Sequence, residues 1–199
     1  MLQKRVCLIA GLGNPGEHYH KTRHNMGFMV ADELGNAFSI PIEKKKSDAL
    51  IGRGRIHDVD VILVKPMSFM NLSGLPVYNI ASYFGISGKD MLIIHDDIDL
   101  ALGIIKLKEK GGHGGHKGIE SLMNSFGGGD FTRLRVGVGR PEKEEIKVSD
   151  YVLGRFNNDE TGILDKIIPL AKDAVVTFLC KGTKEAMNKF NNKKIVISS

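Results

Sequence analysis

Short apolar runs alternate with stretches of helical periodicity along this chain. The run at residues 6–10 predicts a first strand, and residues 26–38 repeat apolar side chains at helical spacing. Two further runs, 49–55 and 59–64, flank a short polar turn and predict a hairpin. Later strands are predicted at 91–95, 104–108 and 134–139, and later helices at 73–85, 118–126, 158–182 and 183–190.

Strands that alternate with helices are typical of a three-layer α/β fold. The hairpin makes the sheet mixed rather than wholly parallel. We therefore expect a mixed, mostly parallel, twisted sheet flanked by helices. With 199 residues the chain is long enough for one core, so residues 1–199 are interpreted as a single catalytic domain. Residues from about 191 to 199 are expected to form a flexible basic tail.

Helix starts in this sequence carry residues that commonly cap free backbone amides. We expect Asn25, Ser73 and Thr183 to cap three helices, and Asn158 or Asp159 to open the longest one. The three lysines at positions 44–46 are expected in a solvated loop.

Four polar clusters follow apolar runs. They are G-L-G-N-P-G at 11–16, K-P-M-S-F-M-N at 65–71, H-D-D at 95–97 and G-G-H-G-G-H-K-G at 111–118. Strand ends form one edge of an open α/β sheet, and that edge is where such folds place their chemistry. We therefore expect the clusters to converge in one cleft. None contains an obvious serine or cysteine nucleophile, which favours a reaction with activated water.

The first cluster matches the spacing G-x-G-x-x-G of dinucleotide-binding folds. Its context argues against that function, because Pro15 lies inside the loop and the predicted helix begins near Asn25 rather than at Gly16. No second strand ending in an acidic residue follows at the expected distance. The glycines alone would be explained by a tight turn, but a turn does not explain why Asn14, Tyr19, His24 and Asn25 crowd beside them.

His24 is the leading candidate for a general base, because imidazole is largely neutral near pH 7 and can accept a proton from water. The alternative is a histidine that caps a helix or lies at the surface. Asp96 offers a partner that would orient the ring and stabilise the imidazolium. The alternative for Asp96 is a loop aspartate that caps backbone donors.

Asn14 and Asn71 are neutral amides that could donate to a developing oxyanion or hold the attacking water. Hydrogen bonding within loops is the alternative for each of them. Phe69 and Met70 belong either to the core or to an apolar wall beside Asn71.

Histidine is also a common metal ligand, and six histidines lie in or near these clusters. No zinc-binding motif is present, so we expect neither a metal nor another cofactor. These six are His18, His20, His24, His95, His113 and His116.

The formal net charge of +5 and the pI near 9.1 fit a polyanionic partner and fit mere solubility equally well. The spacing of the cations adds information, because Lys106 and Lys108 alternate along one predicted strand and therefore share a face.

No apolar run approaches the ~20 residues of a membrane span, so we expect no membrane partner. Two cysteines are too few for a disulfide framework, which favours the cytoplasm.

Taken together, the four clusters resemble the bacterial-type peptidyl-tRNA hydrolases over nearly the whole chain. The resemblance rests on G-L-G-N-P-G with T-R-H-N, on K-P-x-x-F-M-N-x-S-G, on H-D-D-x-D-L, and on G-G-H-G-G-H followed by F-x-R-L-R-V-G-V-G-R-P, in that order. It implies hydrolysis of the ester between a peptide and the 3′ end of tRNA, which recycles tRNA from abandoned translation. It also implies a metal-free monomer without an obligate protein partner.

The resemblance assigns roles to individual residues. His24 matches the family's catalytic histidine, Asp96 its supporting aspartate, and Asn14 the residue that favours peptidyl over aminoacyl substrates. Lys117 stands where the family usually has asparagine, and would either meet a phosphate or point to solvent. The other candidates for substrate or tRNA binding are Tyr19, Asn25, Phe69, Met70, Asn71, Lys106, Lys108 and Arg135.

Two other functions remain alternatives at this point. One is a non-catalytic RNA-binding module that uses only the basic face, and the intact His24, Asp96 and Asn71 argue against it. The other is an esterase or amidase for small acylated compounds, against which the basic strand face argues.

Overall fold

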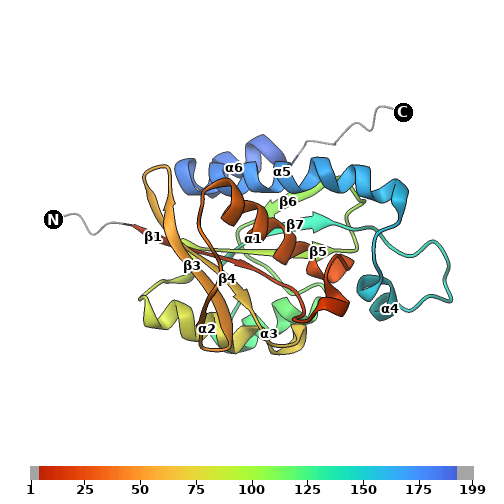
Figure 1. Ribbon diagram of the computed structural model, residues 1–199, viewed down its shortest axis with the longest axis horizontal. Helices are drawn as coiled ribbons and strands as arrows, with labels where there is room; N and C mark the ends of the chain where they lie inside the picture. The colour runs from red at the N-terminus through yellow and green to blue at the C-terminus, as the bar shows by residue number, and fades with distance from the viewer. Residues whose placement is uncertain (1–4, 192–199) are drawn as a thin grey trace.

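A seven-stranded sheet forms the centre of the computed structural model, which describes residues 5–191 (Figure 1). Its strand order is β2-β3-β4-β1-β5-β7-β6. Neighbours among β4, β1, β5 and β7 are parallel, whereas β2, β3 and β6 each pair antiparallel with a neighbour. The predicted mixed, mostly parallel sheet is therefore confirmed. The strands are β1 Val6–Gly11, β2 Lys44–Lys46, β3 Ala49–Ile56, β4 Val59–Pro66, β5 Met91–Asp97, β6 Ile105–Lys108 and β7 Thr132–Gly137.

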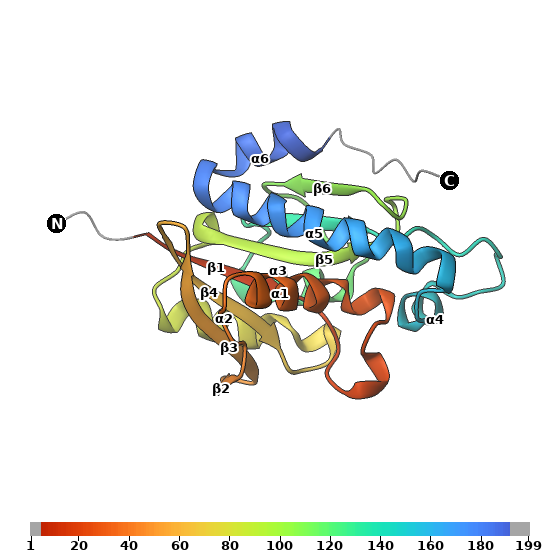
Figure 2. The ribbon, with the colours of Figure 1, turned by 45° about the horizontal axis from the view of Figure 1, so that its top comes forward.

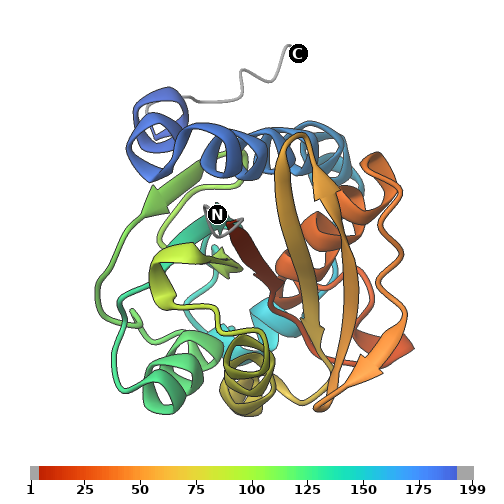
Figure 3. The same ribbon diagram turned by 90° about the vertical axis from the view of Figure 1, so that its left-hand side faces the viewer.

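Helices cover both faces of the sheet and complete the three layers. Figure 3 shows α5 and α6 in blue on one side of the sheet, and α2 and α3 in yellow to green on the other. Figure 2 shows α1 lying alongside α5. The helices are α1 Met26–Ala37, α2 Gly74–Tyr83, α3 Lys117–Phe126, α4 Val148–Leu153, α5 Asn158–Lys181 and α6 Thr183–Phe190.

Alternation along the central strand divides the core into two. Cys7 and Ile9 of β1 pack in the cluster beneath α1 and α5, whereas Leu8 and Ala10 pack in the cluster beneath α2. All four side chains are fully buried, as the period-two geometry of a strand covered on both faces requires. Among residues 5–191, no helix combines the length and apolar character needed to cross a membrane.

Three predicted helix caps differ from the structure. Asn25 precedes α1 but makes no cap, because its amide is bonded to Asn14 instead. Ser73 is fully buried, and its hydroxyl has no hydrogen-bond partner among the described residues. Thr183 lies inside α6, and its hydroxyl contacts that of Thr132. In each case a tertiary contact or burial replaces the local capping geometry.

Two further expectations can be compared with the structure. The helix α5 begins at Asn158 as expected, but Asn157 caps it, in a capping box with Glu160. The lysines at 44–46 form the edge strand β2 rather than a loop. Exposed lysines suit an edge strand, because they discourage pairing with another chain. Most of the predicted tail at 191–199 lies outside the described residues.

Candidate active site

A pocket of about 810 Å³ opens where the parallel strands β1, β4, β5 and β7 end. The predicted convergence of the clusters at this edge is borne out for the first three, which directly follow or end β1, β4 and β5. The fourth cluster reaches the pocket by another route. It follows β6, which runs antiparallel to β7, so its residues return to the pocket through the loop that leads into α3.

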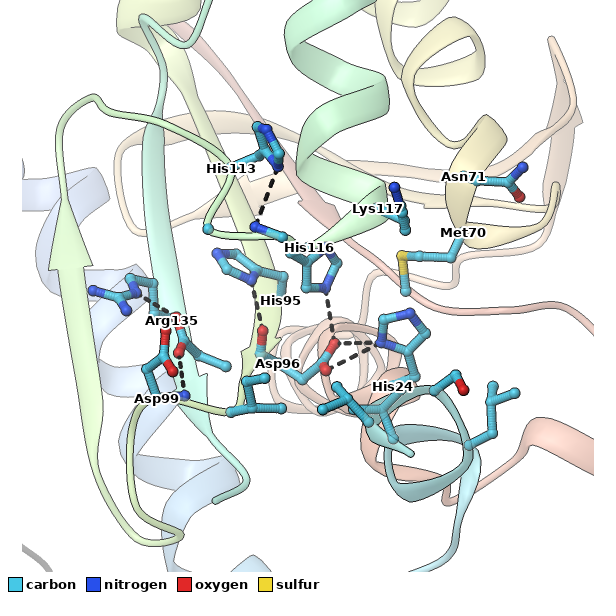
Figure 4. A pocket seen from close by; sticks show the side chains of 18 of the residues that line it. His24, Met70, Asn71, His95, Asp96, Asp99, His113, His116, Lys117 and Arg135 are labelled. Carbon is cyan, nitrogen blue, oxygen red and sulfur yellow. Dashed lines mark hydrogen bonds and ion pairs between the residues drawn. The ribbon is translucent and has the colours of Figure 1, made fainter. Parts of the chain in front are cut away.

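Asp96 is the centre of the site. It is the penultimate residue of β5, is 2% exposed, and accepts hydrogen bonds from two histidines (Figure 4). His24 Nδ1 lies 2.9 Å and 3.1 Å from its two carboxylate oxygens, and His116 Nε2 lies 2.9 Å from the first of these. The predicted pairing of His24 with Asp96 is therefore present. The contribution of His116 was not foreseen from the sequence.

The hydrogen bonds assign the protons of both rings. His116 Nδ1 accepts from the backbone amides of Gly118 and Ile119 at the start of α3, so its proton is on Nε2 and is donated to Asp96. His24 Nδ1 faces the carboxylate and donates to it. The lone pair of His24 is therefore on Nε2, and this is the nitrogen at which a general base accepts a proton from water.

Electrostatics within this trio favours an ionised aspartate. Burial alone would raise the pKa of Asp96, but the charges and hydrogen bonds of His24 and His116 lower it well below its usual range. For His24, burial opposes protonation, yet the attraction and hydrogen bond of Asp96 outweigh it and raise the pKa of the imidazole. A raised pKa makes the ring a stronger base, which suits proton abstraction.

His95 lies next to the trio but differs in chemistry. Its Nδ1 donates to the backbone oxygen of Asp96 at 2.7 Å, and its ring packs edge-on against His116. Burial has the largest effect on the pKa of His95, and the neighbouring His116 has the next largest. Together they lower this pKa well below its ordinary value. It therefore stays neutral and supports the backbone of Asp96.

The turn that carries His24 is tied to the rest of the molecule by Arg23. This guanidinium donates to both carboxylate oxygens of Glu160, at 2.7 and 2.8 Å, and to the backbone oxygen of Arg155. The rings of Tyr151 and Phe156 lie within cation–π distance of it. Arg23 is 8% exposed although it is charged. The motif T-R-H-N includes Arg23, but no role could be assigned to it from the sequence, because its partners are more than 120 residues away.

Asn14 is held in a fixed orientation by two neighbours. Its backbone exchanges two hydrogen bonds with the side chain of Asn25, and its side-chain oxygen accepts from the backbone amide of Met70 at 2.7 Å. The side-chain NH₂ of Asn14, which lines the pocket, remains as a donor for substrate. Asn25, expected among the substrate-binding residues, does not line the pocket and instead positions Asn14.

The remaining candidates form the rim and the wall of the pocket. Tyr19 and Phe69 meet edge-to-face, and Phe69 is 56% exposed. Met70 is buried beside them, and Asn71 and Lys117 line the far end. The ammonium of Lys117 is exposed and pairs with Glu120 at 3.0 Å on the surface of α3.

A basic surface borders the opposite side of the pocket. Lys106 and Lys108 pair with Arg135 and Arg133 across β6 and β7, so all four share one face of the sheet. Lys108 and Arg135 line the pocket, whereas Lys106 lies outside it. Arg135 pairs with Asp97, and Arg133 is buried and donates to the backbone oxygens of Gly111 and Gly112. Arg133 thereby ties the glycine-rich loop to the sheet.

The described residues include one group that could hold a metal ion, the trio of His24, Asp96 and His116. One ligand atom from each lies within 4.8 Å of the others. The present hydrogen bonds already use these atoms, because protons on the two histidines point at the carboxylate. A metal would have to displace both protons.

Comparison with known proteins gives a consistent result. The family model described as peptidyl-tRNA hydrolase matches residues 8–197. The peptidyl-tRNA hydrolase of Bacillus subtilis is 42% identical over 188 residues, which cover 94% of this chain and all of that protein. The corresponding protein of Clostridium novyi is 43% identical over 189 residues, covering 95% of this chain and all of that protein.

Solved structures agree with the sequence relatives. A crystal structure of peptidyl-tRNA hydrolase from Acinetobacter baumannii superposes with a TM-score of 0.89 at 38% identity, covering 98% of both chains. A complex of a peptidyl-tRNA hydrolase with n-propanol superposes with a TM-score of 0.90 at 38% identity, covering 96% of this chain and 97% of that chain.

Proposed function

The chain belongs to the peptidyl-tRNA hydrolase family and is a hydrolase that releases peptide from peptidyl-tRNA, and from that premise we propose which of its residues perform the reaction. The observation that carries the proposal is the carboxylate of Asp96 between His24 and His116. This arrangement leaves one basic nitrogen, His24 Nε2, at the pocket.

In the first step His24 Nε2 accepts a proton from a water molecule as the water oxygen attacks the ester carbonyl. The new C–O bond gives a tetrahedral intermediate with a negatively charged oxygen, and Asp96 stabilises the imidazolium. In the second step the bond to the ribose 3′ oxygen breaks, and the proton on His24 Nε2 passes to that oxygen. The products are a peptide carboxylic acid and tRNA with a free 3′-hydroxyl. A positioned base of this kind contributes roughly 10²–10⁴-fold in rate.

The two amides supply hydrogen bonds that the ester needs. Asn71 lies at the pocket with an exposed side chain and is the donor to the developing oxyanion or to the attacking water. The fixed NH₂ group of Asn14 meets the carbonyl of the next peptide bond. A free aminoacyl ester lacks that carbonyl, so Asn14 favours peptidyl substrates. Tyr19, Phe69 and Met70 form the apolar wall around the acyl chain.

Lys106, Lys108 and Arg135 bind phosphates of the tRNA. They lie on one face of the sheet at the border of the pocket, which suits an acceptor end whose ester reaches His24. Phosphate contacts position the nucleic acid without reading its sequence, so one enzyme can serve all tRNAs. We further propose that the protein works in the cytoplasm as a monomer, without a metal and without an obligate protein partner.

The proposal is tested by the release of tRNA from purified N-acetyl-aminoacyl-tRNA. The parent protein should release tRNA, and His24→Asn should lose at least about 100-fold in kcat. His57→Asn is the matched control, because His57 is an exposed histidine with φ of 50° in the turn of the hairpin, a conformation that asparagine tolerates. Equal rates for the parent and His24→Asn would show that His24 is not the base.

A further inference from the structure

A second groove, of about 430 Å³, opens between the start of α2 and the exposed side of α3. Asn71 and Lys117 line both this groove and the catalytic pocket, so the two are continuous at these residues. The groove has an apolar side formed by Leu72, Leu75 and Pro76. Its polar side is formed by α3, which contributes Glu120, Ser121, Asn124 and Ser125, and Asp48 and Ser68 also line the groove.

The apolar side of the groove is unusually exposed. Leu72 is 57% exposed and Leu75 is 60% exposed, and both lie outside the two core clusters. A core role therefore does not account for either side chain. Two neighbouring leucines that border a groove and open to water are suited to bind an apolar ligand group.

The walls of the groove are held at a fixed separation. The backbone amide of Gly74 donates to Ser121 Oγ at 2.9 Å. A Cβ at Gly74 would collide with the backbone oxygen of Ser121, so the start of α2 packs directly on α3. The groove is thus a preformed feature of the contact between two helices.

The direction of the substrate follows from the position of the basic face formed by β6 and β7. In Figure 4, Arg135 lies on one side of Asp96, and Asn71 and Lys117 lie on the other. If tRNA occupies the basic side, the acyl chain extends from His24 on the other side of the pocket, where Asn71 and Lys117 lie. The next feature in that direction is the second groove.

We propose that this groove binds the peptide residues that precede the esterified residue, and that Leu72 and Leu75 select apolar side chains there. The inference rests on the proposed function, because the direction of the chain depends on where the tRNA and the ester lie. Asn124 provides an amide for the peptide backbone, while the leucines contact one of its side chains. The groove is therefore a specificity subsite for the peptide part of the substrate.

Three substrates on the same tRNA test the proposal: acetyl-Ala, acetyl-Leu-Leu-Ala and acetyl-Ser-Ser-Ala esters. The parent should cleave the Leu-Leu substrate about tenfold more efficiently in kcat/KM than the Ser-Ser substrate. In Leu75→Ser, and more so in Leu72→Ser/Leu75→Ser, that ratio should fall toward one, while acetyl-Ala, which is too short to reach the groove, is cleaved as before. Leu75→Glu should instead favour a substrate with lysine at the same positions.

Tyr83→Ser is the matched control, since Tyr83 is a 66% exposed apolar residue on the same helix that does not line the groove. It should keep the parent's ratio. A parent ratio near one, or a ratio that survives both leucine substitutions in folded protein with normal cleavage of acetyl-Ala, would overturn the proposed subsite. Failure of the parent to cleave any of the three substrates would instead contradict the proposed function.

Discussion

His24 Nδ1 lies 2.9 Å from a carboxylate oxygen of Asp96, although 72 residues separate the two in the sequence. The carboxylate is almost completely buried and the imidazole largely so. Because water screens the pair so little, the charge of Asp96 acts strongly on the basicity of His24. The pH dependence of the reaction is therefore a direct test of this contact.

The first prediction concerns the acidic limb of the pH profile of kcat/KM. The reaction needs neutral His24, and its pKa is raised, so activity should fall on the acidic side with a midpoint above the ordinary imidazole value of about 6.5. Asp96→Asn removes the charge that raises this pKa, so the midpoint should move to lower pH. The plateau should drop by about 10²–10⁴-fold. A midpoint that stays in place in the variant would show that Asp96 does not set the basicity of His24.

His116→Asn provides the second prediction. Asparagine retains an oxygen that can cap α3, but it is too short to reach Asp96. One hydrogen bond to a charged group is worth about 1.5–3 kcal/mol, so kcat should fall by roughly 10–150-fold while the fold is kept. His113→Asn, in the exposed part of the same loop, should stay close to the parent. Full activity of His116→Asn would show that the contact of His116 with Asp96 does not contribute to catalysis.

The third prediction concerns the partly buried pair of Arg23 and Glu160. Glu160→Gln keeps the shape of the side chain but removes the charge that faces the guanidinium. We expect the free energy of unfolding to fall by about 1–3 kcal/mol, measured by urea denaturation. Arg55→Gln is the control, because Arg55 makes an exposed ion pair with Asp60, and such pairs contribute at most about 1 kcal/mol. Equal losses in the two variants would mean that burial adds nothing to the Arg23 pair.

Metal dependence is the subject of the fourth prediction. Incubation with a chelator, followed by its removal, should leave the activity unchanged, because protons already occupy the space between the histidines and Asp96. Added Zn²⁺ should inhibit, since it would compete with the proton for the same three side chains. Loss of activity on chelation, with recovery on adding back a metal, would contradict the metal-free mechanism.

Much of the fold follows from the sequence pattern. The alternation along residues 6–10, the hairpin signal at 49–64 and the helical spacing of residues 26–38 each correspond to an observed element. These signals are local and strongly periodic, which is why they are reliable. The convergence of His24 with Asp96 was also foreseeable, because polar residues at the ends of parallel strands meet at one edge of the sheet.

The features that were missed depend on partners distant in sequence. Asn25 was expected to cap a helix, and its amide is instead used by Asn14. His116 was one of several histidines in a glycine-rich stretch, and its contact with Asp96 depends on a loop that Arg133 anchors to the sheet. A propensity or a motif does not show which side chain satisfies a buried polar group, since this is decided by the tertiary structure.

The basic face of β6 and β7 gives the last prediction, on the dependence of KM on salt. A side chain that binds a phosphate releases about one counterion, so each lost contact should reduce the slope of log KM against log salt by about 0.7–0.9. Lys108→Ala should therefore raise KM at low salt and flatten this slope, while kcat at saturating substrate changes little. Lys45→Ala is the matched control, because Lys45 is an exposed lysine on β2, the opposite edge of the same sheet. A slope that is flattened equally by both variants would indicate a general effect of net charge, and would show that the tRNA does not lie against this face.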